Sequence, residues 1–157
     1  MGKHQEIEEV INDLRRIFQA ISQHSREAER ESGLTGPQLW ALQILDTAAP
    51  IRVSELANQM YLSAATVVGI VDRLEAKQLV SRTRSTADRR AVDLDLTRQG
   101  RELVDRAPKV TQVMLLKGLE ALPDADLEVV AAGMKQMVRI LGAEALVPQP
   151  LQHSLQG

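Results

Sequence analysis

Hydrophobic residues recur at three- and four-residue spacing in several segments of the chain, a period that predicts amphipathic helices. The longest of these segments predicts a helix over residues 5–31, which Gly33 ends. A second helix is expected to begin after Thr35, because Thr35 and Gln38 have the spacing of a capping box. The first third of the chain is therefore expected to be helical.

The middle of the chain changes from helical spacing to strict alternation. Ser54 and Ser63 are each placed to cap a short helix, and the brief connection between these helices (61–63) is typical of a helix-turn-helix. Residues 79–84 and 92–96 then predict the two strands of a hairpin, the second from its alternating apolar and polar residues. Together these elements predict a winged helix-turn-helix.

The last third of the chain returns to helical spacing. Thr97 is expected to cap a helix that Pro108 kinks, and a last helix is expected over residues 124–141. Residues 143–157 contain two prolines and several glutamines, so we expect them to form a flexible C-terminal tail.

The predicted fold class is mainly α (α+β), a winged helix-turn-helix with long flanking helices. We expect residues 35–97 to form the winged domain and residues 1–34 and 98–142 to form a helical dimerisation region. The flanking helices carry apolar stripes that are too large for a monomer to leave in water, so we expect them to pair two copies of the chain as a homodimer.

Composition narrows the class of function. The chain has 157 residues, of which 44% are hydrophobic and 25% are charged, and this is the length and balance of one globular domain. It has no cysteine, no catalytic motif and no paired metal-ligand spacing, so we expect neither an enzyme nor a bound cofactor or metal. No apolar run approaches ~18 residues and no leader pattern opens the chain, which predicts a cytoplasmic protein without a membrane partner.

The distribution of charge points to a nucleic-acid partner although the net charge is −2. Residues 63–100 carry 7 Lys or Arg against 5 Asp or Glu. Four of these cations fall within nine residues that span the expected hairpin, namely Arg82, Arg84, Arg89 and Arg90. Because local charge decides where phosphate binds, we expect the hairpin and the helix before it to contact double-stranded DNA.

Four short stretches of the chain occur in a fixed order and spacing. They are Leu34-Thr35-x-Pro37-Gln38-x-Trp40-x-Leu42, Ser54-Glu55-Leu56-Ala57, Leu62-Ser63-x-x-Thr66-Val67-x-x-Ile70-Val71-Asp72-Arg73-Leu74-Glu75 and Asp88-Arg89-Arg90-x-x-x-Leu94-x-Leu96-Thr97-x-x-Gly100. In this order they resemble the MarR family of bacterial transcription regulators, and the resemblance extends over about residues 5–142. It implies a homodimer that binds inverted-repeat DNA and releases it when a small, often phenolic or anionic, ligand binds.

The helix that Ser63 caps is expected to present its outward face to the DNA bases. The polar candidates for DNA contact on this helix are Ser63, Thr66 and Arg73, and the small ones are Ala65, Val68 and Gly69. Many MarR relatives have Thr where this chain has Val68, and often Arg or Gly at the next position. Side-chain hydrogen bonds to the bases are therefore expected to come from Ser63, Thr66 and Arg73.

The hairpin is the second expected DNA contact. By the resemblance, Arg90 is the residue that enters the minor groove, while Arg82, Arg84 and Arg89 are placed to meet phosphate. Arginines of an exposed strand and loop can equally face water. Asp88 is expected to support the wing, either by pairing with Arg90 or by closing the turn.

An effector site is expected where the flanking helices meet the winged domain. Its candidate residues are Arg16, Ile17, Ile21, His24 and Trp40, although Trp40 is also a natural core residue. The predicted function is a DNA-binding regulator, and specifically a repressor released by an aromatic or anionic ligand. A constitutive regulator, an activator and a winged-helix protein-interaction module stay open as alternatives.

Overall fold

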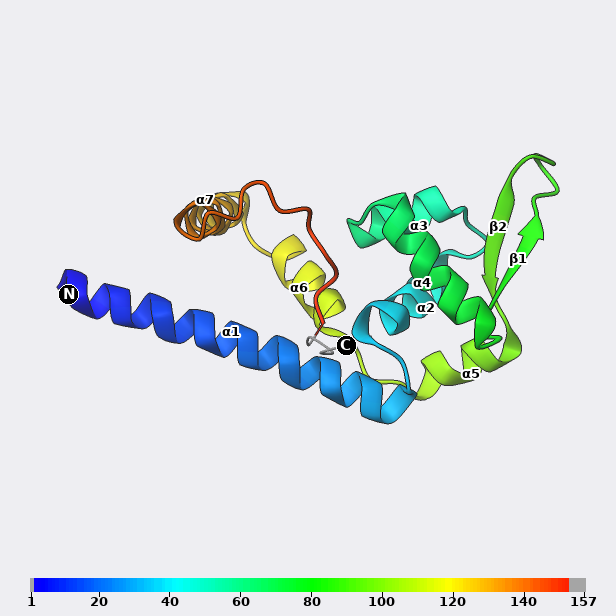
Figure 1. Ribbon diagram of the computed structural model, residues 1–157, viewed down its shortest axis with the longest axis horizontal. Helices are drawn as coiled ribbons and strands as arrows, with labels where there is room; N and C mark the ends of the chain where they lie inside the picture. The colour runs from blue at the N-terminus through cyan, green and yellow to red at the C-terminus, as the bar shows by residue number, and fades with distance from the viewer. Residues whose placement is uncertain (1, 153–157) are drawn as a thin grey trace.

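The computed structural model describes residues 2–152 and is mostly helical, with one two-stranded sheet among those residues (Figure 1). In chain order the elements are α1 (Lys3–Ser32), α2 (Gly36–Ala48), α3 (Val53–Met60), α4 (Ala64–Ala76), β1 (Val80–Arg84), β2 (Val92–Leu96), α5 (Arg98–Arg106), α6 (Thr111–Glu120) and α7 (Asp124–Ile140). This order confirms the predicted fold class, because a helix-turn-helix (α3 and α4) precedes a β-hairpin wing and long helices flank both.

Three helices begin where the sequence predicts. Thr35 Oγ1 accepts a hydrogen bond from the Gln38 N–H, and the Gln38 side chain accepts one from the Thr35 N–H, which completes the capping box of α2. Ser63 caps α4 by accepting from the Thr66 N–H, and Thr97 caps α5 in the same way. These bonds satisfy backbone donors that a helix N-terminus otherwise leaves unpaired.

The predicted start of α3 is wrong. The helix begins at Val53 with Arg52 as its N-cap, so Ser54 lies inside the first turn instead of capping it. Ile51 explains the earlier start, because two backbone hydrogen bonds with Leu94 of β2 hold Ile51 as a short extended piece beside the sheet. The chain therefore turns into α3 directly after this pairing.

Pro108 separates two helices instead of kinking one, which corrects the single helix expected here. Helix α5 ends at Arg106, Ala107 is extended with φ −84° and ψ 151°, and α6 begins at Thr111. Steric clash with a following proline disfavours the helical conformation, so the break already starts at Ala107. The freed Pro108 carbonyl accepts a hydrogen bond from the Gln43 side chain of α2 at 2.9 Å.

The hydrophobic core lies in the winged region and includes α5. Buried leucines of α2 pack against α4, β2 and α5, and Leu103 of α5 belongs to this core. A Cβ atom at Gly100 would lie 2.2 Å from the Leu79 carbonyl oxygen, so only glycine lets α5 approach the wing this closely. Helix α5 thus packs with the winged domain, although it falls within the expected dimerisation segment 98–142.

The wing is an antiparallel hairpin whose pairing runs from Val80↔Leu96 to Arg84↔Val92. Leu94 of β2 is fully buried between polar neighbours that are only partly buried. The alternation predicted for this strand is therefore present, with one face on the core and the other toward solvent.

Helices α1, α6 and α7 lie largely outside this core. In Figure 1, α1 is one long rod that extends away from the winged region and meets it only near its C-terminal end, and α7 lies beyond α6, away from α3 and α4. No residue of α7 is buried. None of the described helices is both long and apolar enough to cross a membrane. The exposed large apolar side chains of the three helices are Ile7, Val10, Ile11, Ile17, Phe18, Met114, Leu115, Leu119, Leu127, Val129, Val130, Met134, Val138 and Ile140.

The segment after α7 is mostly exposed, with Ala143 and Pro150 half-buried, and it contacts α6. Residues 143–152 run back from α7 toward the middle of the molecule (Figure 1), where the Leu151 carbonyl accepts a hydrogen bond from the Gln112 side chain of α6 at 2.7 Å. The rest of the expected tail, residues 153–157, lies outside the described residues.

Candidate nucleic-acid interface

Helix α4 has one buried face and one face of small residues. The buried face consists of Val67, Ile70, Val71 and Leu74, which fix the helix on the core. Ala65 and Val68 are exposed on the other side of the helix. A Cβ atom added at Gly69 would meet no other atom within 4 Å. Nothing in the described fold requires a glycine there, and the small face lets the helix backbone approach a grooved partner closely.

The N-terminus of α4 presents two hydroxyl groups. Ser63 Oγ accepts a hydrogen bond from the Thr66 N–H at 3.2 Å and lies 2.9 Å from Thr66 Oγ1. The first N–H groups of a helix attract phosphate, and hydroxyl groups beside them can donate to phosphate or to a base edge. Both residues therefore stay predicted DNA contacts.

Arg82 of β1 is held by two carboxylates of α4. Its guanidinium donates to Asp72 at 2.5 Å and to Glu75 at 2.9 Å, and its side chain is 27% exposed. The hydrogen bond to Asp72 and the nearby charge of Glu75 raise the pKa of Arg82. Because two carboxylates already pair with its charge, Arg82 ties the wing to α4 and is less available than the other wing arginines for the phosphate contact expected from the sequence.

The tip of the wing is closed by side chains of the loop itself. Ser85 Oγ accepts hydrogen bonds from the N–H groups of Ala87 and Asp88 at 3.2 and 3.4 Å. Asp88 Oδ1 accepts from the Arg90 N–H at 3.0 Å. Of the two roles considered for Asp88 beside Arg90, closing the turn is therefore the one that the structure shows.

Asp88 also joins the wing to the helix-turn-helix. Its Oδ2 lies 3.6 Å from the Nη2 of Arg52, the N-cap of α3. Sequence reasoning missed Arg52, Ser85 and Glu75. Ser85 had a local signal, because a serine three residues before an aspartate is typical of a closed turn. The other two had none, because their partners lie on different elements.

Four arginines of α4 and the wing have no carboxylate partner within residues 2–152. Arg73, Arg84, Arg89 and Arg90 are all exposed, and none of them takes part in an ion pair with another described residue. Four unpaired guanidinium groups thus lie on α4 and the wing, and positive charge without an acidic partner is what a phosphate-binding surface requires.

Comparison with known proteins agrees with this geometry. The family model described as "MarR family" matches residues 34–92, from the residue before the α2 cap to the start of β2. The chain contains a MarR-family domain over residues 34–92. MarR-family proteins are DNA-binding transcriptional regulators and not enzymes, which confirms the predicted class of function.

Similarity to individual MarR relatives extends beyond the winged region. The transcriptional repressor MdtR of Bacillus subtilis (strain 168) is 39% identical over 87 residues, 55% of this chain and 56% of MdtR, so the match spans just over half of that relative. The structure of a MepR-like protein complexed with pseudoligands has a TM-score of 0.56 and 26% identity, over 90% of this chain and 97% of the other. BpsR of Bordetella bronchiseptica, whose DNA binding is regulated by 6-hydroxynicotinic acid, has a TM-score of 0.57 and 26% identity, over 82% of this chain and 91% of the other.

Four of the five residues expected to form an effector site lie along α1, namely Arg16, Ile17, Ile21 and His24. Arg16 pairs with Asp13 at 2.7 Å, with both side chains mostly exposed. Ile17 is exposed and Ile21 is half-buried. The positive charge expected at this site is therefore used within α1 itself.

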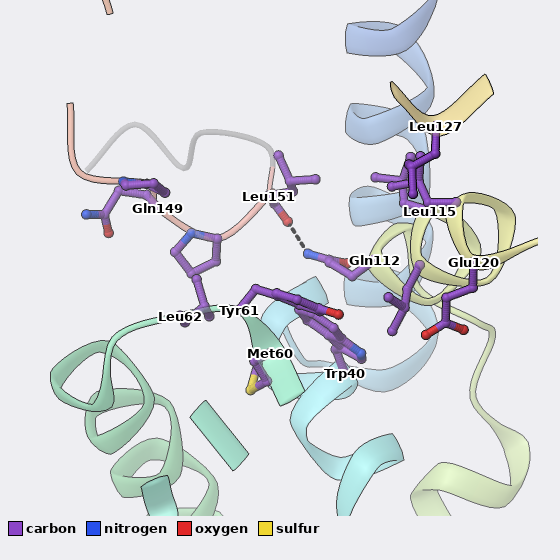
Figure 2. A pocket seen from close by; sticks show the side chains of 14 residues that line it. Trp40, Met60, Tyr61, Leu62, Gln112, Leu115, Glu120, Leu127, Gln149 and Leu151 are labelled. Carbon is purple, nitrogen blue, oxygen red and sulfur yellow. Dashed lines mark hydrogen bonds between the residues drawn. The ribbon is translucent and has the colours of Figure 1, made fainter. Parts of the chain in front are cut away.

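His24 and Trp40 have separate positions in the MarR fold. His24 Nδ1 lies 3.0 Å from Thr111 Oγ1 and joins α1 to α6. Trp40 is a core residue, as considered from the sequence, and its edge also lines a cavity of about 470 Å³ between α2, the end of α3, α6 and the C-terminal segment (Figure 2). Trp40 is thus the one of the five expected effector residues that lines this cavity.

Proposed function

We propose that this MarR-family chain is a homodimeric repressor that binds an inverted-repeat operator and leaves it when a small molecule binds. In this proposal α4 enters the major groove and the wing reaches the neighbouring minor groove. The observation that carries it is the pairing of the arginines. Arg82 is neutralised inside the fold, while Arg73, Arg84, Arg89 and Arg90 have no acidic partner among the described residues. Free guanidinium groups are what phosphate and a narrow minor groove attract.

We assign dimerisation to α1, α6 and α7, within the segments 1–34 and 98–142. The support for this assignment is that α7 has no buried residue and that apolar side chains of all three helices are exposed in the single chain. Contiguous apolar surface of this kind is typical of a protein interface. A two-fold pair would set the two α4 helices about one DNA turn, ~34 Å, apart, which matches two halves of an inverted repeat.

Release by a small molecule is supported by the relatives and by the cavity beside Trp40. MdtR is named a repressor, and 6-hydroxynicotinic acid regulates the DNA binding of BpsR. The cavity in this chain is bounded by α2 of the winged domain and by α6. A molecule bound there touches both regions and can favour one relative position of the α4 helices, typically with about 1–3 kcal/mol of coupling.

The test is DNA binding measured with fragments from upstream of the protein's own gene. Fluorescence anisotropy should show one inverted-repeat fragment bound at least about 10³-fold more tightly than a scrambled fragment of equal composition. The logarithm of the affinity should fall linearly with the logarithm of the salt concentration, because phosphate contacts release counterions. Equal affinity for both fragments would contradict sequence-specific regulation.

A further inference from the structure

The C-terminal segment forms one wall of the cavity beside Trp40. Residues 148–151 line it on one side, and Trp40 of α2, Tyr61 at the end of α3 and leucines of α6 line the others. Figure 2 shows Trp40, Tyr61, Gln112 and Leu151 around the same space. With a volume of about 470 Å³, the cavity has room for a compact organic molecule.

The only formal charge in this lining is negative. Glu120 of α6 lines the cavity, whereas no Lys, Arg or His among the described residues does so. Most of the remaining lining is apolar. A carboxylate placed here would meet no opposite charge from this chain and would lie in the same cavity as the carboxylate of Glu120.

Gln112 has a buried side-chain amide of which only the nitrogen has a hydrogen-bond partner among the described residues. The residue is 7% exposed, and its Nε2 donates to the Leu151 carbonyl at 2.7 Å. Its Oε1 accepts no hydrogen bond from another residue within 2–152. A buried acceptor without a partner favours a ligand that brings a donor, since an unpaired buried polar atom is costly.

We propose that this cavity binds a compact apolar molecule that carries an N–H or O–H donor and no negative charge. The donor bonds Gln112 Oε1, the apolar body fills the space between Trp40 and the α6 leucines, and a cationic donor gains further from Glu120. Ligand binding in the cavity does not depend on the proposed function, but any effect of the ligand on DNA binding does. Of the two ligand classes expected from the sequence, aromatic and anionic, this selectivity excludes the anionic one.

Three probes with one apolar body and different charge test the proposal. They are 1-adamantylmethylamine, 1-adamantanecarboxamide and 1-adamantanecarboxylate, which are transparent at the wavelengths of tryptophan fluorescence. Trp40 is the only tryptophan of the chain and lines the cavity, so its emission reports binding without DNA. We expect the amine and the amide to bind at least tenfold more tightly than the carboxylate. Equal or tighter binding of the carboxylate, or no binding of any probe at millimolar concentration, overturns the proposal.

Two variants locate the selectivity. Glu120→Gln should weaken the amine relative to the amide and narrow the gap to the carboxylate, because it removes the charge and keeps the shape. Glu128→Gln, on exposed α7 outside the lining, is the matched control and should leave all three affinities unchanged. If both variants behave alike, Glu120 does not set the selectivity and the proposal fails.

Gln112→Leu tests the hydrogen-bond acceptor. It should weaken the amine and the amide together by several-fold while circular dichroism stays that of the native chain. If this variant does not fold, the Glu120→Gln comparison still decides the proposal. Operator affinity of every variant is measured separately without probes. A protein that binds the amine but no operator contradicts the proposed function alone, and one that binds operator but no probe contradicts this inference alone.

Discussion

Arg90 is the residue at which the wing contact can be tested most directly. It is exposed at the tip, where its backbone N–H is bound by Asp88 while its guanidinium has no acidic partner among residues 2–152. We expect Arg90→Ala to weaken operator binding by about 1–3 kcal/mol in each half-site, because one guanidinium contact is lost per wing. Anisotropy titrations of a full operator and of a half-site measure the loss.

Arg98→Ala is the matched control for Arg90. Arg98 is also exposed but lies on α5, where it pairs with Glu102 at 3.2 Å. Its removal should change neither operator affinity nor the midpoint of thermal unfolding beyond the small effect of an ordinary surface substitution. Similar affinity losses in both variants would mean that net charge, and not the wing, accounts for the result.

Gly69 reports whether α4 faces the bases. Gly69→Glu places a carboxylate on the small face and should abolish operator binding, because it adds negative charge next to phosphate and blocks close approach. Gly69→Ala has open space for its Cβ and should stabilise the helix by up to about 1 kcal/mol without abolishing binding. Thermal unfolding and anisotropy separate the two effects, and retained binding by the glutamate variant would show that α4 does not lie against the groove.

At the scale of elements, the wing depends on Asp88 in two ways that two substitutions separate. The Asp88 carboxylate closes the turn through the Arg90 N–H and also faces Arg52 of α3. Asp88→Asn keeps an acceptor for the turn and loses the ion pair, whereas Asp88→Ala loses both. We expect the alanine variant to bind operator more weakly than the asparagine variant, with thermal stability changed by less than about 1 kcal/mol because the ion pair is exposed. Equal affinities would show that turn geometry is unimportant for binding.

The elements that follow from local chemistry are the ones that sequence reasoning predicts well. Thr35, Ser63 and Thr97 cap helices as expected, because each cap is decided within three residues. The start of α3 and the break at Pro108 were predicted less well. The start of α3 depends on the pairing of Ile51 with the distant strand β2. The break at Pro108 is accompanied by a hydrogen bond from a side chain of α2 to the Pro108 carbonyl.

The candidate site divides in the same way. The small face and the hydroxyl end of α4 could be identified from helical spacing alone. The sequence could not show which arginines lack an acidic partner. Arg82 differs from Arg84 only because the fold places two carboxylates of α4 beside it. The cavity was also out of reach, because one of its walls is a C-terminal segment whose composition suggested a loose tail.

At the scale of the whole molecule, the proposed dimerisation can be tested directly by substitution on α7. Met134 lies on the apolar stripe of α7 and is 55% exposed in the single chain. If this stripe forms the dimer interface, Met134→Glu buries an unpaired charge there and should shift the protein toward monomer. Sedimentation velocity at low micromolar concentration measures the shift, with the unchanged chain expected to sediment as a dimer.

Ala132→Glu is the control for this prediction, because position 132 lies on the polar face of α7 with Glu128 and Lys135. It should leave the dimer intact. A stable, folded monomer of the unchanged chain would contradict the proposed assembly, and so would equal dissociation of both variants.

Ala65 and Val68 of α4 offer methyl groups at positions where a longer side chain would offer hydrogen bonds. A helix of this kind responds to the C5 position of pyrimidines, where thymine and 5-methylcytosine carry a methyl group and uracil and cytosine carry only hydrogen. We expect an operator with deoxyuridine in place of thymidine at the contacted positions to bind more weakly. At a contacted cytosine, methylation should strengthen binding. Control by this protein would then depend on the methylation of its operator, with no residue dedicated to sensing it.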